Sequence, residues 1–464
     1  MDGPHMMRFV PAPVWTFAVF AMLVAGGPTA RAQADGPPQP SATANKPADA
    51  RQFAEWRKQI EQALFIPDPL PAIAARSYGS FSPVAGVVAE RVTYATTYGM
   101  RVPAIVYRPA KASGRLPGLV VVNGHSGDKT AWYAYYTGIL YARAGAVVVT
   151  YDPVGEDERN SGRNSETKAH DTFVPGVEMP ERMGGQMIGD VMQAVSYLTQ
   201  RADVDTKRIG VVAYSMGSFH AAIAGALDPR IHALVLSGGG NLDGAGGYWE
   251  SSSKVMCQAG PYKALSFLGD RGAVLYALNQ QRGATFIING TADPLVLSKN
   301  TLEPFFEDLR NRTAAISGTR AGLFETYWIQ GAGHRPNFVT RPAALWLESQ
   351  LHFPNWTEAS IRAMGEVHIS EWAAQTGAHI GSSFANEASE GGVRALDAGV
   401  PNLQREALFA VPGEEWKRQK SDFVWESWVE RARAASLRSA GDSCRGGAPG
   451  LRAIGPLQGR VLAR

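Results

Sequence analysis

Residues 209–227 read Ile-Gly-Val-Val-Ala-Tyr-Ser-Met-Gly-Ser-Phe-His-Ala-Ala-Ile-Ala-Gly-Ala-Leu, an apolar run followed at once by a helix-forming run. Ser215 lies at the junction, with the small residues Ala213 and Gly217 two positions before and after it. A serine on such a tight turn stands clear of the sheet, and small neighbours let the crowded backbones approach. The helix that follows places its positive N-terminal end and the Met216 N–H close to the carbon atom that such a serine attacks. The stretch therefore predicts a nucleophilic serine at the end of a buried strand.

Apolar runs that alternate with helical patterns surround this stretch. The runs occupy residues 119–122, 146–151, 209–214, 233–236, 286–288 and 324–329. Upstream, residues 92–97 and 102–107 flank a short turn and predict a hairpin. Strands that are buried on both faces and separated by helices imply a mostly parallel sheet with right-handed crossovers. We therefore expect a doubly wound α/β domain over residues 76–352.

The composition is typical of a folded globular protein. The chain has 464 residues, of which 45% are hydrophobic and 19% charged, so it is able to bury a sizeable core. Lys and Arg number 45 against 42 for Asp and Glu, and the surplus lies in the C-terminal residues 437–464. A near-neutral body without a basic stripe excludes nucleic acid as the main partner.

The N-terminal residues have the pattern of an export signal. Arg8 precedes an apolar stretch, residues 14–25, which is too short to span a bilayer core of about 30 Å. Ala30-Arg31-Ala32 then gives the small-x-small pattern that signal peptidase cleaves. We predict that residues 1–32 are a signal peptide and that the mature protein is secreted or periplasmic, without stable membrane insertion. A membrane anchor is the alternative interpretation.

The rest of the chain divides by composition. Residues 33–75 begin as a linker rich in Pro and Ala and continue as one amphipathic helix. A cap insertion is expected at about 242–281, between two strands of the main domain. Residues 353–436 are rich in Trp and predict a C-terminal helical extension packed on that domain, with one helix over 415–435. Residues 437–464 are expected to form a disordered tail.

Cysteine usage and ligand spacing give little sign of a bound group. The chain has two cysteines, Cys257 and Cys444, and the sequence leaves open whether they pair. Neither the paired Cys and His spacing typical of zinc nor a Gly-rich phosphate loop followed by Lys occurs. We expect no cofactor and no metal ion. The oligomeric state stays open.

A serine nucleophile requires a base and an acid, and both have candidates at strand ends. A histidine takes the serine proton, and a carboxylate fixes the tautomer of that histidine. Asp293 follows the run 286–288 within a turn-rich loop, and His334 follows the run 324–329 in a Gly-flanked loop. The carboxyl ends of parallel strands meet at one edge of the sheet, so both side chains are expected near the serine. Asp243, in the Gly-rich loop after residues 233–236, is the rival candidate for the acid.

The oxyanion hole has two predicted donors. One is the Met216 N–H. The second is expected from the loop Asn123-Gly124-His125-Ser126-Gly127, because its glycines let a main-chain N–H approach a substrate carbonyl closely. Either His125 or Ser126 supplies this donor, and the side chain of His125 is equally consistent with a structural role in the loop.

These residues resemble the α/β-hydrolase superfamily over about residues 76–352. The loop at 123–127 and the later Tyr151-Asp152-Pro153-Val154-Gly155-Glu156-Asp157-Glu158-Arg159 are similar to the branch that includes acetyl xylan esterases and dienelactone hydrolase-like proteins. The resemblance implies that Ser215, Asp293 and His334 act as nucleophile, acid and base. It implies the oxyanion hole at Met216 and residues 125–126. The substrate stays open, since one scaffold hosts many chemistries.

The resulting hypothesis is an exported serine carboxylic-ester hydrolase that acts through an acyl-enzyme. Its expected substrate is a small-molecule or polysaccharide ester, such as an acetylated plant polysaccharide. Trp249 and Tyr262 in the cap, and Trp132 and Tyr133 after the oxyanion loop, are candidate substrate-binding residues. The alternatives are an exported serine peptidase of the prolyl-oligopeptidase type and a non-catalytic hydrolase-like binding protein.

Overall fold

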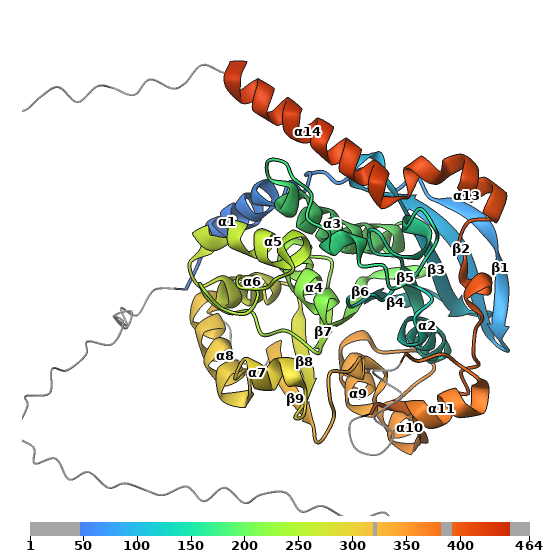
Figure 1. The fold of residues 1–464 in the computed structure, drawn as a ribbon. Helices are drawn as coiled ribbons and strands as arrows, with labels where there is room; N and C mark the ends of the chain where they lie inside the picture. The colour runs from blue at the N-terminus through green and yellow to red at the C-terminus, as the bar shows by residue number, and fades with distance from the viewer. Residues whose placement is uncertain (1–46, 319–322, 382–391, 446–464) are drawn as a thin grey trace, which may run out of the picture. The chain divides into compact units, whose positions relative to one another are not determined.

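A computed structural model describes residues 47–318, 323–381 and 392–445 of the chain. The predicted signal peptide and the last part of the predicted tail, residues 446–464, lie outside this part of the chain. The centre of the fold is a nine-stranded sheet with the order β1-β2-β3-β5-β4-β6-β7-β8-β9 (Figure 1). The strands are β1 (Arg76–Val84), β2 (Val87–Ala95), β3 (Arg101–Pro109), β4 (Leu116–Val122), β5 (Val147–Tyr151), β6 (Val204–Tyr214), β7 (Ala233–Ser237), β8 (Ala284–Gly290) and β9 (Phe324–Ile329).

The sheet is antiparallel at one edge and parallel over the rest. β1, β2, β3 and β5 pair antiparallel in turn, whereas β5, β4, β6, β7, β8 and β9 pair parallel. Every residue of β4, β5, β7 and β8 is buried, which explains why these strands appear as continuous apolar runs in the sequence. The predicted doubly wound, mostly parallel α/β fold is confirmed, and so is the hairpin formed by β2 and β3.

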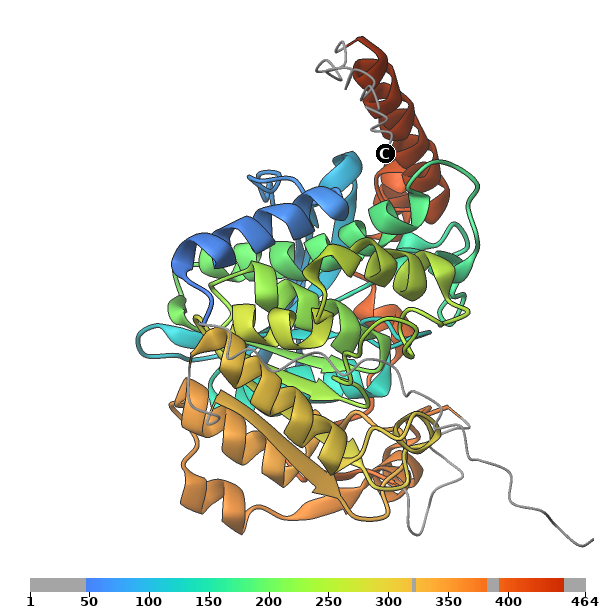
Figure 2. The ribbon, with the colours of Figure 1, turned by 90° about the vertical axis from the view of Figure 1, so that its left-hand side faces the viewer.

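Helices cover both faces of the sheet. One apolar core lies between the sheet and α1 (Ala50–Ala63), α3 (Met179–Thr199), α4 (Met216–Leu227), α6 (Arg271–Asn279) and α8 (Glu303–Ser317). A second core lies on the opposite face, against α2 (Trp132–Ala144), α9 (Arg341–Leu351) and the C-terminal extension. Figure 2 shows α1 and α8 on one side of the sheet and α9 on the other. No helix in the described ranges combines the length and apolar character needed to cross a bilayer.

The segment between β7 and β8 is only partly a cap. It contains the π-helical turn η4 (Val255–Ala259), the short helix α5 (Gly260–Ala264) and α6. α6 packs against α4 and α8 in the helical layer beside the sheet. Two parallel neighbouring strands require a crossover, and α6 supplies it between β7 and β8. The predicted cap at about 242–281 therefore extends too far along the chain at its C-terminal end, because its last helix, α6, belongs to the main domain.

The C-terminal extension contains α10 (Glu358–Ala363), a small antiparallel pair β10 (Glu366–His368) and β11 (Arg394–Leu396), α11 (Ile369–Thr376), α13 (Gly413–Gln419) and α14 (Trp425–Arg445). Trp356, Trp372, Trp416 and Trp428 are buried, so they pack inside the protein instead of presenting a carbohydrate platform.

Two expectations for the C-terminal segment are wrong. The single helix over 415–435 is two helices, α13 and α14, because the chain turns at residues 420–424 to bury Phe423 and Val424. The predicted start of the tail at 437 is also wrong, since α14 continues to Arg445. Residues 434–440 are mostly helix-forming, and the first Gly pair follows only at 446–447. Among the described residues, Cys257 is a buried free thiol.

Candidate active site

Ser215 lies on the strand-to-helix turn between β6 and α4. Its backbone has φ 54° and ψ −119°, a strained conformation that persists only where surrounding structure enforces it. A Cβ on Gly217 would lie 2.5 Å from the carbonyl oxygen of Asn123 and 2.6 Å from that of Val122. The fully buried Ala213 meets the same demand for a small residue on the other side of the turn. The packing of the turn therefore requires the small residues that the sequence places there.

The structure brings Ser215, Asp293 and His334 together at the carboxyl edge of the sheet. Ser215 Oγ lies 2.8 Å from His334 Nε2, and His334 Nδ1 lies 2.8 Å from Asp293 Oδ2. The carboxylate only accepts, so Nδ1 carries the proton and Nε2 offers its lone pair to the serine. Asp293 is fully buried and its other oxygen accepts from the Leu295 N–H at 2.8 Å. This arrangement has the geometry of a nucleophile, base and orienting acid.

Asp243, the rival acid, lies in a different environment. Its carboxylate accepts from the Tyr248 N–H in the insertion between β7 and β8. Burial raises the pKa of Asp243 above its ordinary value, and the hydrogen bonds from backbone N–H groups only partly offset this. The position beside His334 is occupied by Asp293 instead. The geometry thus favours Asp293 as the acid.

Tyr214 supports the histidine loop, a role that the sequence analysis missed. Its hydroxyl donates to the main-chain oxygen of His334 at 3.0 Å, and the two rings lie 5.0 Å apart. Burial raises the pKa of Tyr214, so its hydroxyl stays a neutral donor. Ser237 adds a second support, because its hydroxyl donates to the main-chain oxygen of Arg335 at 2.6 Å. The sequence signal for Tyr214 is its place next to Ser215.

The loop at 123–127 lies beside Ser215 and is held by Tyr133. The Gly124 N–H donates to the Tyr133 hydroxyl at 3.3 Å, and the Asn123 side-chain amide donates to the carbonyl of Tyr151 at 2.9 Å. Of the two candidate donors, His125 lines the same cavity as Ser215, whereas Ser126 faces a wider cleft. The position of the loop is therefore fixed by side chains that are far apart in the sequence.

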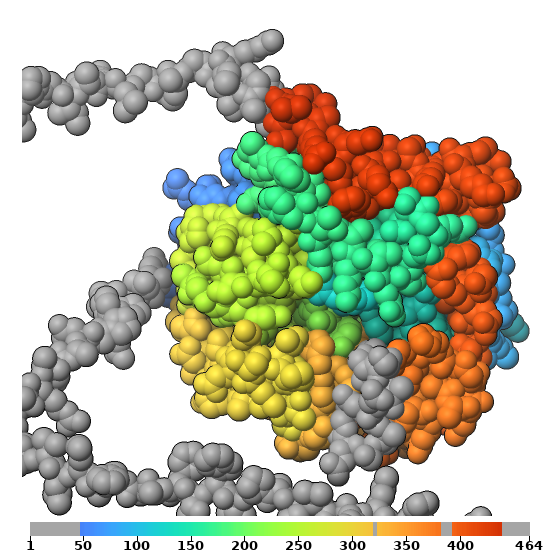
Figure 3. Space-filling view, viewed as in Figure 1, coloured from blue at the N-terminus to red at the C-terminus, as the bar shows by residue number. Residues whose placement is uncertain are grey.

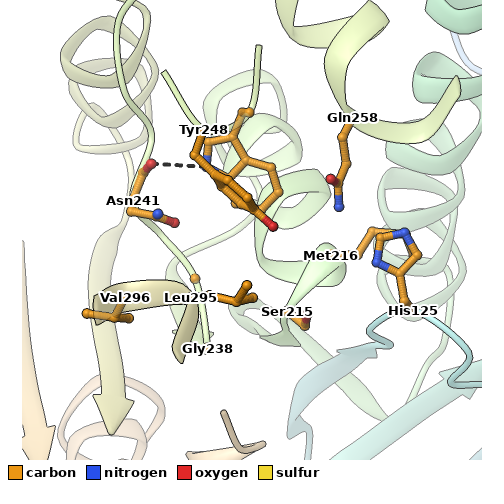
Figure 4. Close-up of a pocket in the computed structure, with 11 residues that line it drawn as sticks. His125, Ser215, Met216, Gly238, Asn241, Tyr248, Gln258, Leu295 and Val296 are labelled. Atoms are coloured by element: carbon orange, nitrogen blue, oxygen red, sulfur yellow. Dashed lines mark hydrogen bonds between the residues drawn. The ribbon is translucent and has the colours of Figure 1, made fainter. Parts of the chain in front are cut away.

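A small cavity of about 70 Å³ opens at Ser215 (Figure 4). Its walls come from four parts of the chain: the loop at 123–127, the start of α4, the segment after β7 and the segment after Asp293. The lining residues are His125, Ser215, Met216, Gly238, Gly239, Asn241, Tyr248, Trp249, Gln258, Leu295 and Val296. The indole N–H of Trp249 donates to the carbonyl oxygen of Asn241 at 3.0 Å, which fixes one wall. Trp249 was expected here; Tyr248, Gln258, Leu295 and Val296 were not.

A wider cleft of about 550 Å³ is also lined by His125. Trp132 and Tyr133 form part of its wall, although both side chains are more than 95% buried. Residues of the C-terminal extension, including Gly377, Ile380 and Arg405, form the facing wall. The extension therefore shapes the space next to the serine.

The expectation that Tyr262 lines the site is wrong. Tyr262 lies in α5 of the insertion and is fully buried; its hydroxyl donates to the main-chain oxygen of Asp243, and the guanidinium of Arg271 stacks over its ring at 4.2 Å. It packs in the first apolar core with Trp249. The sequence did not distinguish an aromatic residue of the insertion that packs into the core from one that faces the cavity.

A buried charge network lies next to the loop. The Lys129 ammonium lies 2.6 Å from Asp152, 2.5 Å from Asp157 and 2.9 Å from Glu158, and all four side chains are fully buried. Burial alone would lower the pKa of Lys129, but attraction by the three carboxylates raises it well above its ordinary value. Since Lys129 supplies the positive charge, Lys129 and the three carboxylates together form a buried ion-pair network within the protein.

The network also holds the C-terminal extension. Glu158 accepts from the N–H groups of Ala410 at 2.6 Å and Val411 at 3.0 Å, and its carbonyl accepts from the Trp416 indole at 2.9 Å. The Arg405 guanidinium pairs with Asp157. The motif of residues 151–159 thus connects the sheet to the extension that lines the wider cleft.

Two protein-family models match the chain. The acetyl xylan esterase model (AXE1) matches residues 73–237, and the prolyl oligopeptidase family model matches residues 176–357. The Bacillus subtilis (strain 168) protein YtaP, named as a hydrolase, is 28% identical over 146 residues. That match covers 29% of this chain and 47%, about half, of the length of the relative.

Several solved structures are similar in fold. The methylesterase BT1017 covers 81% of this chain and 78% of its own, at 18% identity and a TM-score of 0.46. Acetyl xylan esterase 1 from Thermoanaerobacterium sp. JW/SL YS485 covers 69% and 99%, at 16% identity and a TM-score of 0.42. A glucuronoyl esterase from Solibacter usitatus covers 66% and 93%, at 16% identity and a TM-score of 0.44.

The sheet topology and the strand-to-helix turn at Ser215 place the chain in the class of proteins with the α/β-hydrolase fold. Within that class, it resembles the acetyl xylan esterases over residues 73–237.

Proposed function

We propose that this protein is an exported serine carboxylic-ester hydrolase that acts through an acyl-enzyme. The observation that carries the proposal is the continuous contact from Ser215 Oγ through the His334 ring to Asp293, with 2.8 Å at each step. His334 Nε2 takes the hydroxyl proton while Oγ attacks the ester carbonyl, and then returns that proton to the leaving alcohol. Water, activated by the same nitrogen, hydrolyses the acyl-enzyme.

The tetrahedral intermediate requires donors for its negative oxygen. We assign these to the main-chain N–H groups of Met216 and His125, since both residues line the cavity that contains Ser215. Met216 is the first residue of α4, so its N–H has no acceptor within the helix and the positive end of the helix faces the oxyanion. Asp293 stabilises the imidazolium that forms.

The cavity favours a short acyl group. A dry cavity of ~150 Å³ is large enough for benzene, and the space at Ser215 is about 70 Å³. An acetyl group fits this space better than a long acyl chain. The wider cleft, at about 550 Å³, then takes the alcohol part of the substrate, such as a sugar of an acetylated polysaccharide. The acetyl xylan esterase match supports the same substrate class.

Export is proposed from residues 1–32, with their apolar stretch and Ala30-Arg31-Ala32. A secreted or periplasmic location suits an enzyme that meets polymeric or environmental esters. N-terminal sequencing of the protein recovered from the periplasm or the medium tests this part. A mature chain that begins after Ala32 supports export, whereas an intact N-terminus in the cytoplasmic fraction contradicts it.

A peptidase is the second candidate, because the prolyl oligopeptidase family model matches residues 176–357, which contain all three candidate catalytic residues. Acyl p-nitrophenyl esters of rising chain length, set against aminoacyl anilides, separate the two functions. Turnover that is highest for acetyl esters and falls with chain length supports the esterase. Cleavage of the anilides alone overturns it. Acetylated sugars and feruloyl and glucuronoyl esters then identify the alcohol and acyl groups.

A non-catalytic binding protein is the remaining alternative from the sequence. A fluorophosphonate probe distinguishes it, because the probe reacts only with an activated serine. We expect labelling of the wild-type protein and none of a Ser215→Ala variant. Absence of labelling in both proteins, with the fold intact by circular dichroism, supports the binding protein.

A further inference from the structure

A cluster of four metal-ligating side chains lies beside the cavity of Ser215. Its members are His125, His170, Asp171 and Cys257. They come from three segments: the loop after β4, the connection between β5 and α3, and the π-helical turn η4 in the insertion after β7. Figure 3 shows the second and third of these segments, green and yellow-green, side by side on one face of the molecule.

The donor atoms of the cluster converge on one point. Asp171 Oδ1 lies 3.1 Å from His125 Nε2, 3.0 Å from Cys257 Sγ and 3.7 Å from His170 Nε2. Cys257 Sγ lies 3.5 Å from His125 Nε2, and all four donor atoms are within 4.8 Å of one another. Zinc bonds of about 2.0–2.3 Å in a tetrahedron separate neighbouring ligand atoms by roughly 3.3–3.6 Å. The spacing in the cluster is close to this.

His170 supplies an independent indication of a ligand. It is fully buried, and its Nδ1–H donates to the carbonyl of Val154 at 3.1 Å, which directs the lone pair of Nε2 into the cluster. Among the described residues, Nε2 has no hydrogen-bond partner. A buried nitrogen without a partner is costly, and a metal ion would satisfy it.

The same atoms do not form a second nucleophile relay. In a Cys-His-Asp relay the thiol and the carboxylate contact opposite nitrogens of the imidazole. Here both Cys257 Sγ and Asp171 Oδ1 approach the same atom, His125 Nε2. Donor atoms that approach the same nitrogen from one side are arranged as ligands are around a shared metal ion.

We propose that His125 Nε2, His170 Nε2, Asp171 Oδ1 and Cys257 Sγ bind a zinc ion. Two imidazoles, a thiolate and a carboxylate are ligands that suit zinc, and four protein ligands make a closed, structural site. The Cys257 thiol releases its proton to solvent as the sulfur–zinc bond forms. Outside the ligands, the Lys254 ammonium contacts the second oxygen of Asp171 at 2.7 Å and orients that carboxylate.

The ion would connect two segments that form the wall of the cavity at Ser215. His125 lines the cavity with Ser215, and Cys257 lies on the insertion whose Gln258 lines it as well. A zinc ion between them fixes the oxyanion loop against the insertion. The inference stands on the donor atoms alone and is independent of the ester chemistry proposed above.

Metal analysis of the purified full chain, prepared without a polyhistidine tag, tests the site. We expect about one zinc ion per chain, which is the occupancy of a single four-ligand site. His170→Gln and Cys257→Ser are expected to lose it. Cys444→Ser and His352→Gln are the matched controls, because each changes the same residue type outside the cluster, and both are expected to keep the ion. Ser215→Ala is expected to keep the ion also.

Cobalt gives a second readout that does not depend on activity or yield. After chelator treatment, Co²⁺ is added to the wild type and to the two cysteine variants. We expect the visible bands of tetrahedral Co²⁺ and a thiolate-to-cobalt charge-transfer band in the wild type and in Cys444→Ser, and loss of the charge-transfer band in Cys257→Ser. The inference is overturned if the wild type holds no zinc and its Tm does not respond to added zinc. Equal metal content in all variants overturns it as well.

Discussion

The hydroxyl of Tyr214 donates to the main-chain oxygen of His334 across 120 positions of sequence, at 3.0 Å. Tyr214 is also the last residue of β6 and directly precedes Ser215, so one residue adjoins the turn of Ser215 and contacts the loop of His334. The hydrogen bond connects the two partners of the proposed proton transfer through one strand.

Tyr214→Phe tests that coupling. The variant keeps the ring against His334 and loses one hydrogen bond, whose net contribution is about 0.5–1.5 kcal/mol. We expect kcat to fall by roughly three- to tenfold, since about 1.4 kcal/mol corresponds to a factor of ten, with little change in KM. Steady-state kinetics on a p-nitrophenyl acetate series and a Tm measurement check this. An unchanged kcat would show that the histidine loop does not need Tyr214.

Asp293→Asn and Asp243→Asn form a matched pair that tests the acid. The amide introduced by Asp293→Asn would face His334 where the ring needs an acceptor, so the histidine is held in the wrong tautomer. We expect kcat to fall about 10⁴-fold for Asp293→Asn, as in other enzymes with this triad. For Asp243→Asn we expect less than a tenfold change, because Asp243 contacts Tyr248 and not His334. The reverse order of effects would move the acid to Asp243.

Gly217→Ala tests the crowding at the nucleophile. The added methyl meets the backbone carbonyls of Val122 and Asn123, and backbone has little freedom to move away. We expect a loss of about 1–3 kcal/mol in the free energy of unfolding and a fall in kcat, because the loop at 123–127 must shift. The control is Gly189→Ala in α3, where the methyl meets only a Thr97 carbon at 3.8 Å.

For the control Gly189→Ala, we expect the free energy of unfolding to stay unchanged or to rise by about 0.5–1 kcal/mol, since alanine is more favourable than glycine inside a helix. Urea unfolding of both variants, with kinetics on the same preparations, makes the comparison. Equal behaviour of the two variants would mean that the turn at Ser215 tolerates a larger residue.

Lys129→Met tests the buried charge network. The substitution leaves Asp152, Asp157 and Glu158 buried without their shared cation, and breaking a buried ion pair typically costs about 3–5 kcal/mol. We expect a loss of that order in the free energy of unfolding. Lys417→Met is the control, since Lys417 is exposed and its removal should change stability by no more than about 0.5 kcal/mol.

The same variant should loosen the C-terminal extension. Glu158 accepts from Ala410 and Val411, so a disturbed network exposes the backbone around residues 405–411. Limited proteolysis followed by mass spectrometry is expected to show cleavage there in Lys129→Met and not in Lys417→Met. Identical cleavage patterns would show that the extension is held by its apolar packing alone.

The sequence by itself determined the fold class and three side chains of the candidate site. Strands such as β4 and β8 are buried along their whole length, and burial on both faces leaves a continuous apolar run that is visible without coordinates. The candidate catalytic residues could be predicted for a related reason. Each of Ser215, Asp293 and His334 follows such an apolar run, and parallel strands end at the same edge of the sheet. β1 was missed because it is an exposed edge strand with many polar residues.

Only the tertiary structure decided which distant side chains meet. Contacts between separate segments include the support of His334 by Tyr214, the pairing of Lys129 with the loop at 152–158, and the cluster of His125, His170, Asp171 and Cys257. The burial of Tyr262 likewise depends on how the segments pack. No spacing rule links residues 125, 170 and 257, and for this reason the sequence did not indicate the proposed metal site. Local periodicity reports whether a residue is buried, whereas the direction of a buried side chain depends on how the segments pack, and packing is a property of the whole chain.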